Sequence, residues 1–373
     1  MTATGVSKPY IPPIPGIEKV NKYTDLIRDK TPFINKNVLV IGKGNAGFET
    51  ADFLIDTAAS IHVSSPNTLK LAWDTHFVGH LRAVNNNLLD TYHLKSQNAV
   101  LDADILKIEE KGEGFTVTFK YSNKAGEVEE LYYDRIILCA GFQLDDAIFD
   151  TSCKPQMAIN DRFADLTPEW ESTNIKDLYF IGTLMQVRDF KKFTSSFIHG
   201  FRYNVRFLSE LLKQKYEQEE LAFSEIELSP EEVLSVIIDR INTVACLWQQ
   251  QGFFCDALMI SDGQARYYRS LTKDYVKEIL AGNYSEYFLI SLEFGEQDPG
   301  HGSNERVNRK DYKNAARSKF LHPIVRHYKH NELLAEHHII EDLMAEWKEP
   351  EHLDPLTEFL KQSLPHYASN TAI

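Results

Sequence analysis

The alternation of apolar and polar residues predicts a strand, a glycine turn and a helix around residue 40. The apolar residues 38–41 run into the turn Gly42-Lys43-Gly44-Asn45-Ala46-Gly47. A helix is expected next, and its apolar residues recur at spacings that place them on one side: Phe48, Ala51, Phe53, Leu54 and Ile55. A second run, residues 60–65, predicts the following strand. This order is typical of a Rossmann-like α/β unit in which helices cover parallel strands.

Between residues 102 and 142, apolar and polar residues begin to alternate with a period of two. Residues 115–119 alternate apolar and polar side chains, and residues 123–126 have the composition of a turn. The apolar run of residues 136–142 ends in Ala-Gly-Phe, and residues 177–183 have a similar ending. We therefore predict a small antiparallel sheet followed by a buried strand that leads the chain into a second domain.

Helix signals dominate the remainder of the chain. Residues 187–216 predict a helix that Ser195 or Ser196 caps, with one apolar face: Phe197, Phe201, Val205, Leu208 and Leu212. Ser229, Pro230 and two glutamates give a further helix start. Residues 333–347 and 355–364 predict two more helices. We expect residues 221–373 to form a mainly helical accessory domain with a few strands.

Composition and charge exclude several classes of protein. The chain has 373 residues, of which 43% are hydrophobic, which suffices for packed cores in two or three domains. A net charge of −14 with dispersed basic residues argues against nucleic acid as a partner. No apolar run is long enough for a membrane span, and no signal peptide opens the sequence.

Metal binding is the weaker interpretation of the cysteines and histidines. The four cysteines contain no C-x-x-C pair, which argues against a zinc knuckle and a redox dithiol. Residues His327 and His330 have a spacing at which two ligands share one side of a helix, but no H-E-x-x-H occurs and many acids are available as partners. We expect no metal site among the C-terminal histidines: His322, His327, His330, His337, His338 and His352.

The glycine turn has the composition of a dinucleotide-binding site. Gly42 permits a sharp turn, Gly44 lets the backbone approach a pyrophosphate, and Gly47 lets the helix pack on the strand. The start of the helix, at Asn45, then offers free N–H groups to the phosphates. A plain glycine-rich loop is the alternative, and the flanking strand and helix favour nucleotide binding.

The end of the second strand indicates which nucleotide binds. A unit that binds NAD usually has Asp or Glu here to accept hydrogen bonds from the ribose, and such an acid repels a 2′-phosphate. In this sequence the strand ends in Ser64 and Ser65, with Lys70 nearby. We therefore predict NADP(H); the alternative is that the serines only cap a loop.

Three stretches in this order resemble flavin-containing monooxygenases: ATGVSKPYIPPIPG, GKGNAGFE and ILCAGF. The resemblance implies an NADPH domain inserted in an FAD domain. It divides the chain into a remnant of the FAD domain and linker (1–31), the NAD(P)-binding domain (32–135), the return to the FAD domain (136–220) and the accessory domain (221–373). It also places Thr4, Gly5, Gly141 and Gly182 beside the flavin nucleotide and directs the helix after Ser195 at the isoalloxazine.

The sequence departs from that family at its beginning. No second G-x-G-x-x-G occurs, so we expect Met1 to be an internal start, the chain to be a fragment, and FAD retention by these residues alone to be weak. Thr183 stands where related disulfide reductases have an aspartate. Arg188, Asp189, Lys191 and Lys192 are candidates for shaping the flavin site, with a solvated loop as the alternative.

Further stretches, including residues 73–97 and 320–330, resemble flavoproteins of the endoplasmic reticulum that serve the disposal of misfolded proteins. This resemblance implies a luminal location, whereas a chain complete as written would be cytoplasmic. Two functions stay open. One is an oxidoreductase that passes hydride from NADPH to FAD and electrons to oxygen or another acceptor, with catalytic residues unassigned. The other is an inactive nucleotide-binding or scaffold fragment that contacts proteins through its C-terminal domain.

Overall fold

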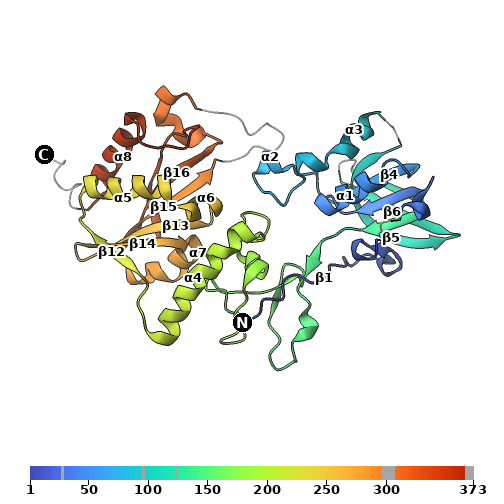
Figure 1. Cartoon of the computed structure of the whole chain (residues 1–373), viewed down its shortest axis with the longest axis horizontal. Coiled ribbons are helices and arrows are strands. Elements are labelled where there is room, and N and C mark those ends of the chain that lie inside the picture. Colours follow the sequence, from blue (N-terminus) through green and yellow to red (C-terminus); the bar gives the residue numbers. More distant parts are fainter. Residues whose placement is uncertain (27–28, 95–96, 123–124, 296–306, 366–373) are drawn as a thin grey trace. The chain divides into compact units, whose positions relative to one another are not determined.

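The computed structural model describes residues 1–26, 29–94, 97–122, 125–295 and 307–365 (Figure 1). Contacts divide the chain into two compact units. We name residues 6–148 and 159–163 the N-terminal unit, and residues 1–5, 149–158 and 164–373 the C-terminal unit. Each unit is described by itself below.

A seven-stranded sheet forms the centre of the N-terminal unit, in the order β2-β8-β3-β4-β5-β6-β7. Strands β2, β8, β3, β4 and the start of β5 are parallel, and β5, β6 and β7 continue as an antiparallel meander. The strands are β2 (Asn21–Lys22), β3 (Asn37–Ile41), β4 (Ser60–Ser65), β5 (Ala99–Lys111), β6 (Gly114–Tyr121), β7 (Val128–Tyr133) and β8 (Arg135–Leu138). The predicted α/β class with a parallel sheet and an appended antiparallel sheet is confirmed.

Shorter elements complete this unit. Strand β1 (Lys8–Pro9) pairs antiparallel with β9 (Phe142–Gln143). The helices are α1 (Asn45–Leu54), α2 (Ala72–Thr75) and α3 (Asn87–Leu94), with the 3-10 turns η1 (Ile17–Lys19), η2 (Tyr23–Asp25), η3 (Thr31–Phe33), η4 (Ala83–Asn85) and η5 (Asp146–Ile148). Of the predicted turn at residues 123–126, residues 123–124 lie outside the described residues.

The period-two alternation of β3 divides the core of this unit into two layers. Val38 and Val40 pack against α1, whose residues Phe48, Ala51 and Leu54 are fully buried. On the other face of the sheet, Leu39 and Ile41 belong to a cluster with Phe119 and Tyr133 of the meander. Helix α1 thus packs its apolar side against the face of the sheet that carries Val38 and Val40.

The C-terminal unit contains a six-stranded antiparallel sheet in the order β12-β14-β13-β15-β16-β17. Its strands are β12 (Phe223–Ile226), β13 (Phe254–Ser261), β14 (Gln264–Thr272), β15 (Glu286–Phe294), β16 (Leu321–Lys329) and β17 (Glu332–His338). The two short strands β10 (Met157–Ala158) and β11 (Phe163–Ala164) precede it in the chain. The mainly helical character expected of residues 221–373 is thus too simple, because a sheet organises this part.

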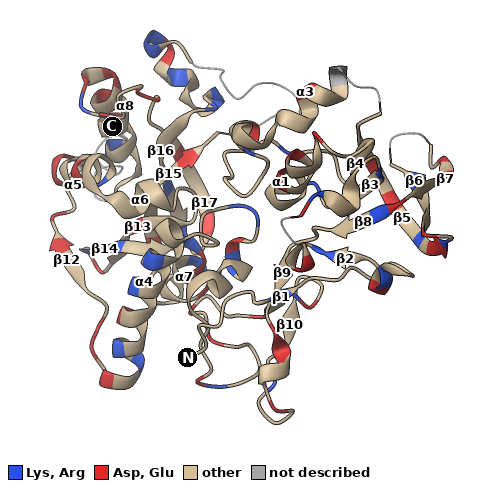
Figure 2. Ribbon diagram, turned by 45° about the vertical axis from the view of Figure 1, so that its right-hand side comes forward, with Lys and Arg blue, Asp and Glu red and all other residues tan. Residues whose placement is uncertain are grey.

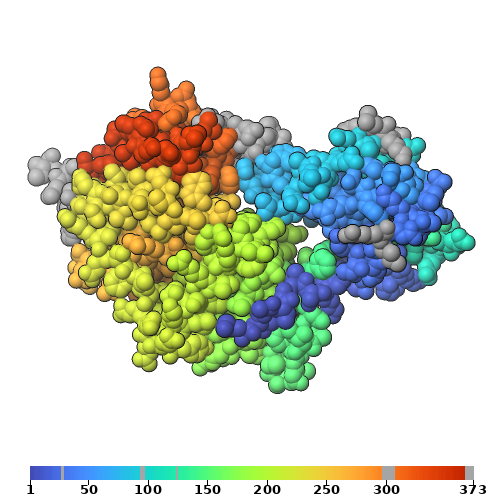
Figure 3. Space-filling view, in the orientation of Figure 1, coloured from blue at the N-terminus to red at the C-terminus, as the bar shows by residue number. Residues whose placement is uncertain are grey.

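Helices flank that sheet: α4 (Ile198–Glu217), α5 (Pro230–Thr243), α6 (Ala245–Gln249), α7 (Lys273–Glu278) and α8 (Pro350–Ser363), with the 3-10 segments η6 (Gly182–Asp189), η7 (Leu280–Asn283) and η8 (Arg309–Arg317). Helix α8, red in Figure 3, lies against α5, yellow in the same view. Acidic and basic residues are interspersed along the elements of each unit (Figure 2). Within the described part of the chain, none of the helices combines the length and the apolar character that a bilayer span requires.

Local helix signals had mixed outcomes. Ser229 caps α5, since its hydroxyl accepts a hydrogen bond from the N–H of Glu232 at 3.3 Å, and Pro230 opens the helix as predicted. Helix α8 confirms the helix expected over residues 355–364. The helix expected over residues 333–347 is wrong, because residues 332–338 form the edge strand β17. The predicted cap by Ser195 or Ser196 is also wrong: α4 begins at Ile198, and Phe197 precedes it.

Candidate functional site

The turn between β3 and α1 needs glycine at two positions because the backbone approaches itself closely. Gly42 has φ 125°, and a Cβ there would lie 2.3 Å from the carbonyl oxygen of Cys139. A Cβ on Gly47 would lie 2.0 Å from the carbonyl oxygen of Gly42. The sharp turn and the close packing of helix on strand predicted for these two glycines are therefore present.

Gly44 differs from both, because the space beside it is open. A Cβ built on Gly44 meets no atom within 4 Å. Gly44 is the residue before α1 and, as a glycine, supplies no side-chain cap to the N–H groups at the start of this helix. An open approach to free N–H groups at the positive end of a helix fits the pyrophosphate of a dinucleotide.

The Asn45 side chain holds the loop that follows α2. Its Nδ2 donates to the carbonyl oxygen of His80 at 2.8 Å. Its Oδ1 accepts from the backbone N–H of Arg82 at 3.1 Å and from the amide of Asn85 at 2.9 Å. Asn45 thus positions residues 80–85 beside the glycine turn, and contact of this residue with a nucleotide stays a prediction.

The two serines at the end of β4 have different environments. Ser64 is fully buried, its hydroxyl has no hydrogen-bond partner in the described structure, and its carbonyl oxygen accepts from the N–H of Gly42 at 2.8 Å. Ser65 is partly exposed, and its hydroxyl donates to the carbonyl oxygen of Asn67 at 3.3 Å. Of the pair, only Ser65 has its side chain at the surface.

An ion pair that sequence reasoning missed lies at the same place. The Lys43 ammonium contacts the carboxylate of Asp102, which stands beside Ser65 in the parallel register of β4 and β5. Burial lowers the pKa of Lys43, and the Asp102 carboxylate opposes this shift only in part. The two residues are 59 positions apart, so only the lysine inside the glycine turn could have drawn attention to them.

A pocket opens in the N-terminal unit beside the first turn of α1. Gly141 has φ 88° there, and a Cβ on it would lie 2.9 Å from the guanidinium of Arg162. Arg162 donates to the carbonyl oxygen of Phe142 at 2.9 Å and covers the ring of Tyr10 at 4.8 Å. The lining is mostly aromatic and aliphatic: Pro9, Tyr10, Tyr23, Thr24, Ala46, Leu138, Cys139, Gly141 and Phe142.

The C-terminal unit brings together three of the residues expected beside a flavin nucleotide. Thr2 forms a parallel bridge with Phe180, so that Thr4 and Gly5 follow one segment while Gly182 follows the other. Gly5 and Gly182 have φ of 66° and 72°, conformations that favour glycine. A Cβ on Gly182 meets no atom within 4 Å, whereas one on Gly5 lies 3.6 Å from Thr183. Gly141, the fourth residue, belongs to the N-terminal unit.

Ser195 belongs to a buried polar network before α4. Its hydroxyl accepts from Asn204 at 2.8 Å and from Gln250 at 3.0 Å, which explains why it does not cap the helix. Its N–H donates to Oδ2 of Asp189 at 3.1 Å. Burial raises the pKa of the Asp189 carboxyl to about 7, and the hydrogen bonds from Ser195 offset this only in part.

The other residues proposed for this region are engaged in ion pairs or exposed. Arg188 contacts Asp274 at 2.7 Å and Glu278 at 2.8 Å, while Lys191 and Lys192 are exposed. His327 lies on β16, where its Nε2 is 2.8 Å from Glu286. The helical spacing considered for a metal site therefore does not apply to it. No cluster of metal-ligating side chains is found within the described ranges.

The chain is similar in sequence to a family of pyridine nucleotide oxidoreductases and to FAD-dependent proteins. Residues 1–182 match the family described as pyridine nucleotide-disulphide oxidoreductase. FAD-dependent oxidoreductase domain-containing protein 2 of Mus musculus is 29% identical over 98% of this chain, and the same protein of Danio rerio is 28% identical over 98%. The chain resembles FAD-dependent oxidoreductase domain-containing protein 2 along almost its whole length. The flavoprotein resemblance expected from the motifs is thereby confirmed.

The match covers only part of these flavoprotein relatives. The chain spans 62% of the length of each of them. Among solved structures, the bacillithiol disulfide reductase of Bacillus cereus is 20% identical in sequence, and its alignment covers 49% of this chain and 52% of that one. The TM-score is 0.36. A TM-score of this size is too low to support an argument about function.

Proposed function

We propose that this chain binds NADPH at the turn between β3 and α1 and acts with FAD as an oxidoreductase. The observation that carries the proposal is the open space beside Gly44 at the uncapped start of α1. The family matched by residues 1–182 and the name of the curated relatives support the same chemistry. A role in the disposal of misfolded proteins in the endoplasmic reticulum belongs to the proposal and rests on the resemblance alone.

The described residues fit both cofactors. The pyrophosphate of NADPH would lie at Gly42, Gly44 and the first N–H groups of α1, with its ribose toward Ser65. Within the C-terminal unit, FAD would be held by Thr4, Gly5, Gly182 and the start of α4. The buried Oδ1 of Asp189 and the buried hydroxyl of Ser196 have no hydrogen-bond partner in the described structure, which fits a polar occupant nearby. When bound, NADPH would be the source of hydride and FAD the group that takes it up for transfer to an acceptor.

The cysteines favour oxygen over a disulfide as the acceptor. Burial raises the pKa of Cys139 to about 11 and that of Cys246 to about 12, and Cys255 is fully buried. Cys153 is exposed, and each of the four is a free thiol. Burial keeps the three buried thiols protonated at neutral pH and hence poor nucleophiles, so a relay through Cys139, Cys246 and Cys255 has little chemical support.

A second candidate is a nucleotide-binding scaffold that contacts proteins through its C-terminal unit. Strand β17 is the edge of the six-stranded sheet, and unpaired edges are sites at which other chains add. Exposed apolar side chains lie on this strand and just after it: Leu333, Leu334, Leu343 and Met344. The scaffold would bind nucleotide without turnover.

Titration with NADPH tests whether the chain binds nucleotide at all, which both the oxidoreductase and the scaffold require. We expect calorimetry on the 373-residue chain to show NADPH binding, and Gly44→Val to abolish it by filling the pyrophosphate position. Gly282→Val is the matched control, because a Cβ on Gly282 also meets no atom within 4 Å. Equal binding by Gly44→Val and the parent would refute the site. A second assay distinguishes the oxidoreductase from the scaffold. FAD and NADPH are added to the chain, and the visible absorption of the flavin is followed. Loss of this absorption, which reports reduction of the flavin, is expected of the oxidoreductase and not of the scaffold.

A further inference from the structure

The Lys43–Asp102 ion pair occupies the position at which a dinucleotide fold recognises the adenosine ribose. That position is the end of the second parallel strand, which here is Ser65 of β4. Asp102 is the direct neighbour of Ser65 on β5. Lys43 reaches the same place from the glycine turn, and its ammonium donates to the carbonyl oxygens of Ser65 at 3.2 Å and Asn67 at 3.1 Å.

The Lys43 ammonium has its hydrogen-bonding capacity filled. It has three N–H groups and three acceptors, namely the two carbonyl oxygens and the Asp102 carboxylate. Its side chain is 5% exposed, whereas that of Asp102 is 22% exposed. Lys43 is therefore not available to a ligand, and its effect on a ligand is exerted through the charge of Asp102.

An unpaired carboxylate beside Ser65 would act against NADPH. A carboxylate at this point of the fold accepts hydrogen bonds from the ribose hydroxyls of NAD and repels a 2′-phosphate. The ammonium cancels that charge at close range. Lys70, which is exposed and follows Ser65 by five residues, leaves a positive charge in the same loop.

We propose that Lys43, by neutralising Asp102, determines which nucleotide the site prefers and so admits the 2′-phosphate of NADPH. The inference rests on the proposed nucleotide binding and adds the residues that set its specificity. Removal of the ammonium alone should convert the site toward NADH, and removal of the carboxylate alone should strengthen the choice of NADPH.

The test is a cycle of variants in the whole chain, with NADPH and NADH titrated separately by calorimetry. The measured quantity is the ratio of the Kd for NADH to the Kd for NADPH. We expect Lys43→Met to lower this ratio about tenfold or more, because an unpaired carboxylate then faces the phosphate. We expect Asp102→Asn to raise it, and the double variant to return it to near the parent value, because both charges are gone.

Lys36→Met is the control, since Lys36 pairs with Asp134 at 3.7 Å next to the opposite end of β3. This variant should leave the ratio unchanged. Equal weakening of both nucleotides in Lys43→Met and in the double variant would show that Lys43 only holds the loop, and would overturn the inference. Should Lys43→Met fail to fold, an unchanged ratio in Asp102→Asn overturns it instead. A parent that binds neither nucleotide refutes the proposed function itself.

Discussion

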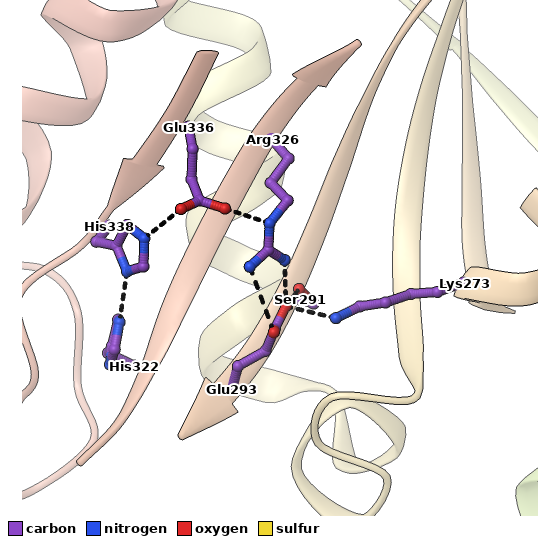
Figure 4. A network of polar contacts seen from close by, with 7 residues as sticks. All are labelled: Lys273, Ser291, Glu293, His322, Arg326, Glu336 and His338. Carbon is purple, nitrogen blue, oxygen red and sulfur yellow. Dashed lines mark hydrogen bonds and ion pairs between the residues drawn. The ribbon is translucent and has the colours of Figure 1, made fainter. Parts of the chain in front are cut away.

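The Nε2 atom of His322 lies 2.8 Å from the Nδ1 atom of His338, so that the two rings are in direct contact (Figure 4). Nδ1 of His322 is 2.7 Å from the carbonyl oxygen of Phe320, which only accepts. Nε2 of His338 is 2.7 Å from the carboxylate of Glu336. Each ring thus makes two polar contacts, and the contact between the two rings joins β16 to β17. Burial lowers the pKa of His322.

Replacement of His338 should therefore destabilise the C-terminal unit. His338→Gln removes the ring nitrogens that contact Nε2 of His322 and the carboxylate of Glu336, and we expect a loss of about 1–3 kcal/mol in the free energy of unfolding. Urea denaturation measures the loss. Glu332→Gln, at an exposed position of the same strand, should change stability little. Equal effects of the two variants would contradict a stabilising role for the contact between His322 and His338.

Glu293 is the centre of the same network, and its loss should cost more. Its carboxylate contacts Lys273 and Arg326, and it accepts from the hydroxyl of Ser291 at 2.5 Å (Figure 4). Burial acts to raise the pKa of Glu293, but the two cations outweigh it and lower the pKa. Glu293→Gln would leave two mostly buried cations without this counterion, with an expected loss of about 3–5 kcal/mol. In the same denaturation assay the exposed Glu225→Gln is the control, and a loss under about 1 kcal/mol would argue against a buried ion network.

The glycine turn could be predicted because its constraints are local in the sequence. Gly42 and Gly47 lie in the same short segment of the chain. The strand before it and the helix after it have clear patterns of apolar and polar residues. Lys43 and Asp102 meet only because β5 lies beside β4, a pairing that no local pattern encodes. The helix wrongly expected over residues 333–347 shows the same limit, since pairing with β16 makes residues 332–338 a strand. Short apolar runs near a sheet edge are ambiguous between the two structures.

Asp189 should make the stability of the C-terminal unit depend on pH. Its pKa is raised to about 7 by burial, whereas an aspartate in the unfolded chain ionises near pH 4. Unfolding therefore releases a proton between these values, and the stabilisation present at low pH is lost as pH rises through this window.

Asp189→Asn should flatten the dependence between about pH 4 and 7, because an amide does not ionise there. The amide oxygen can still accept from the N–H of Ser195. Denaturation midpoints at several pH values across the window measure the effect, with the exposed Asp239→Asn as control. A variant that keeps the slope of the parent would place the titrating group elsewhere.

The last prediction concerns the acceptor of electrons in a protein that holds both cofactors. We expect the cysteines to be spectators, because three of them are buried and each of the four is a free thiol. Serine at Cys139 and Cys153 and alanine at Cys246 and Cys255 should leave NADPH oxidation and peroxide release within a few-fold of the parent. Serine suits Cys139 because Thr50 Oγ1 lies 3.6 Å from its sulfur and can hydrogen-bond to the new hydroxyl. The visible spectrum of the variant controls for loss of flavin. Turnover that stops while flavin stays bound would reveal a thiol relay, and oxygen would then no longer be the preferred acceptor.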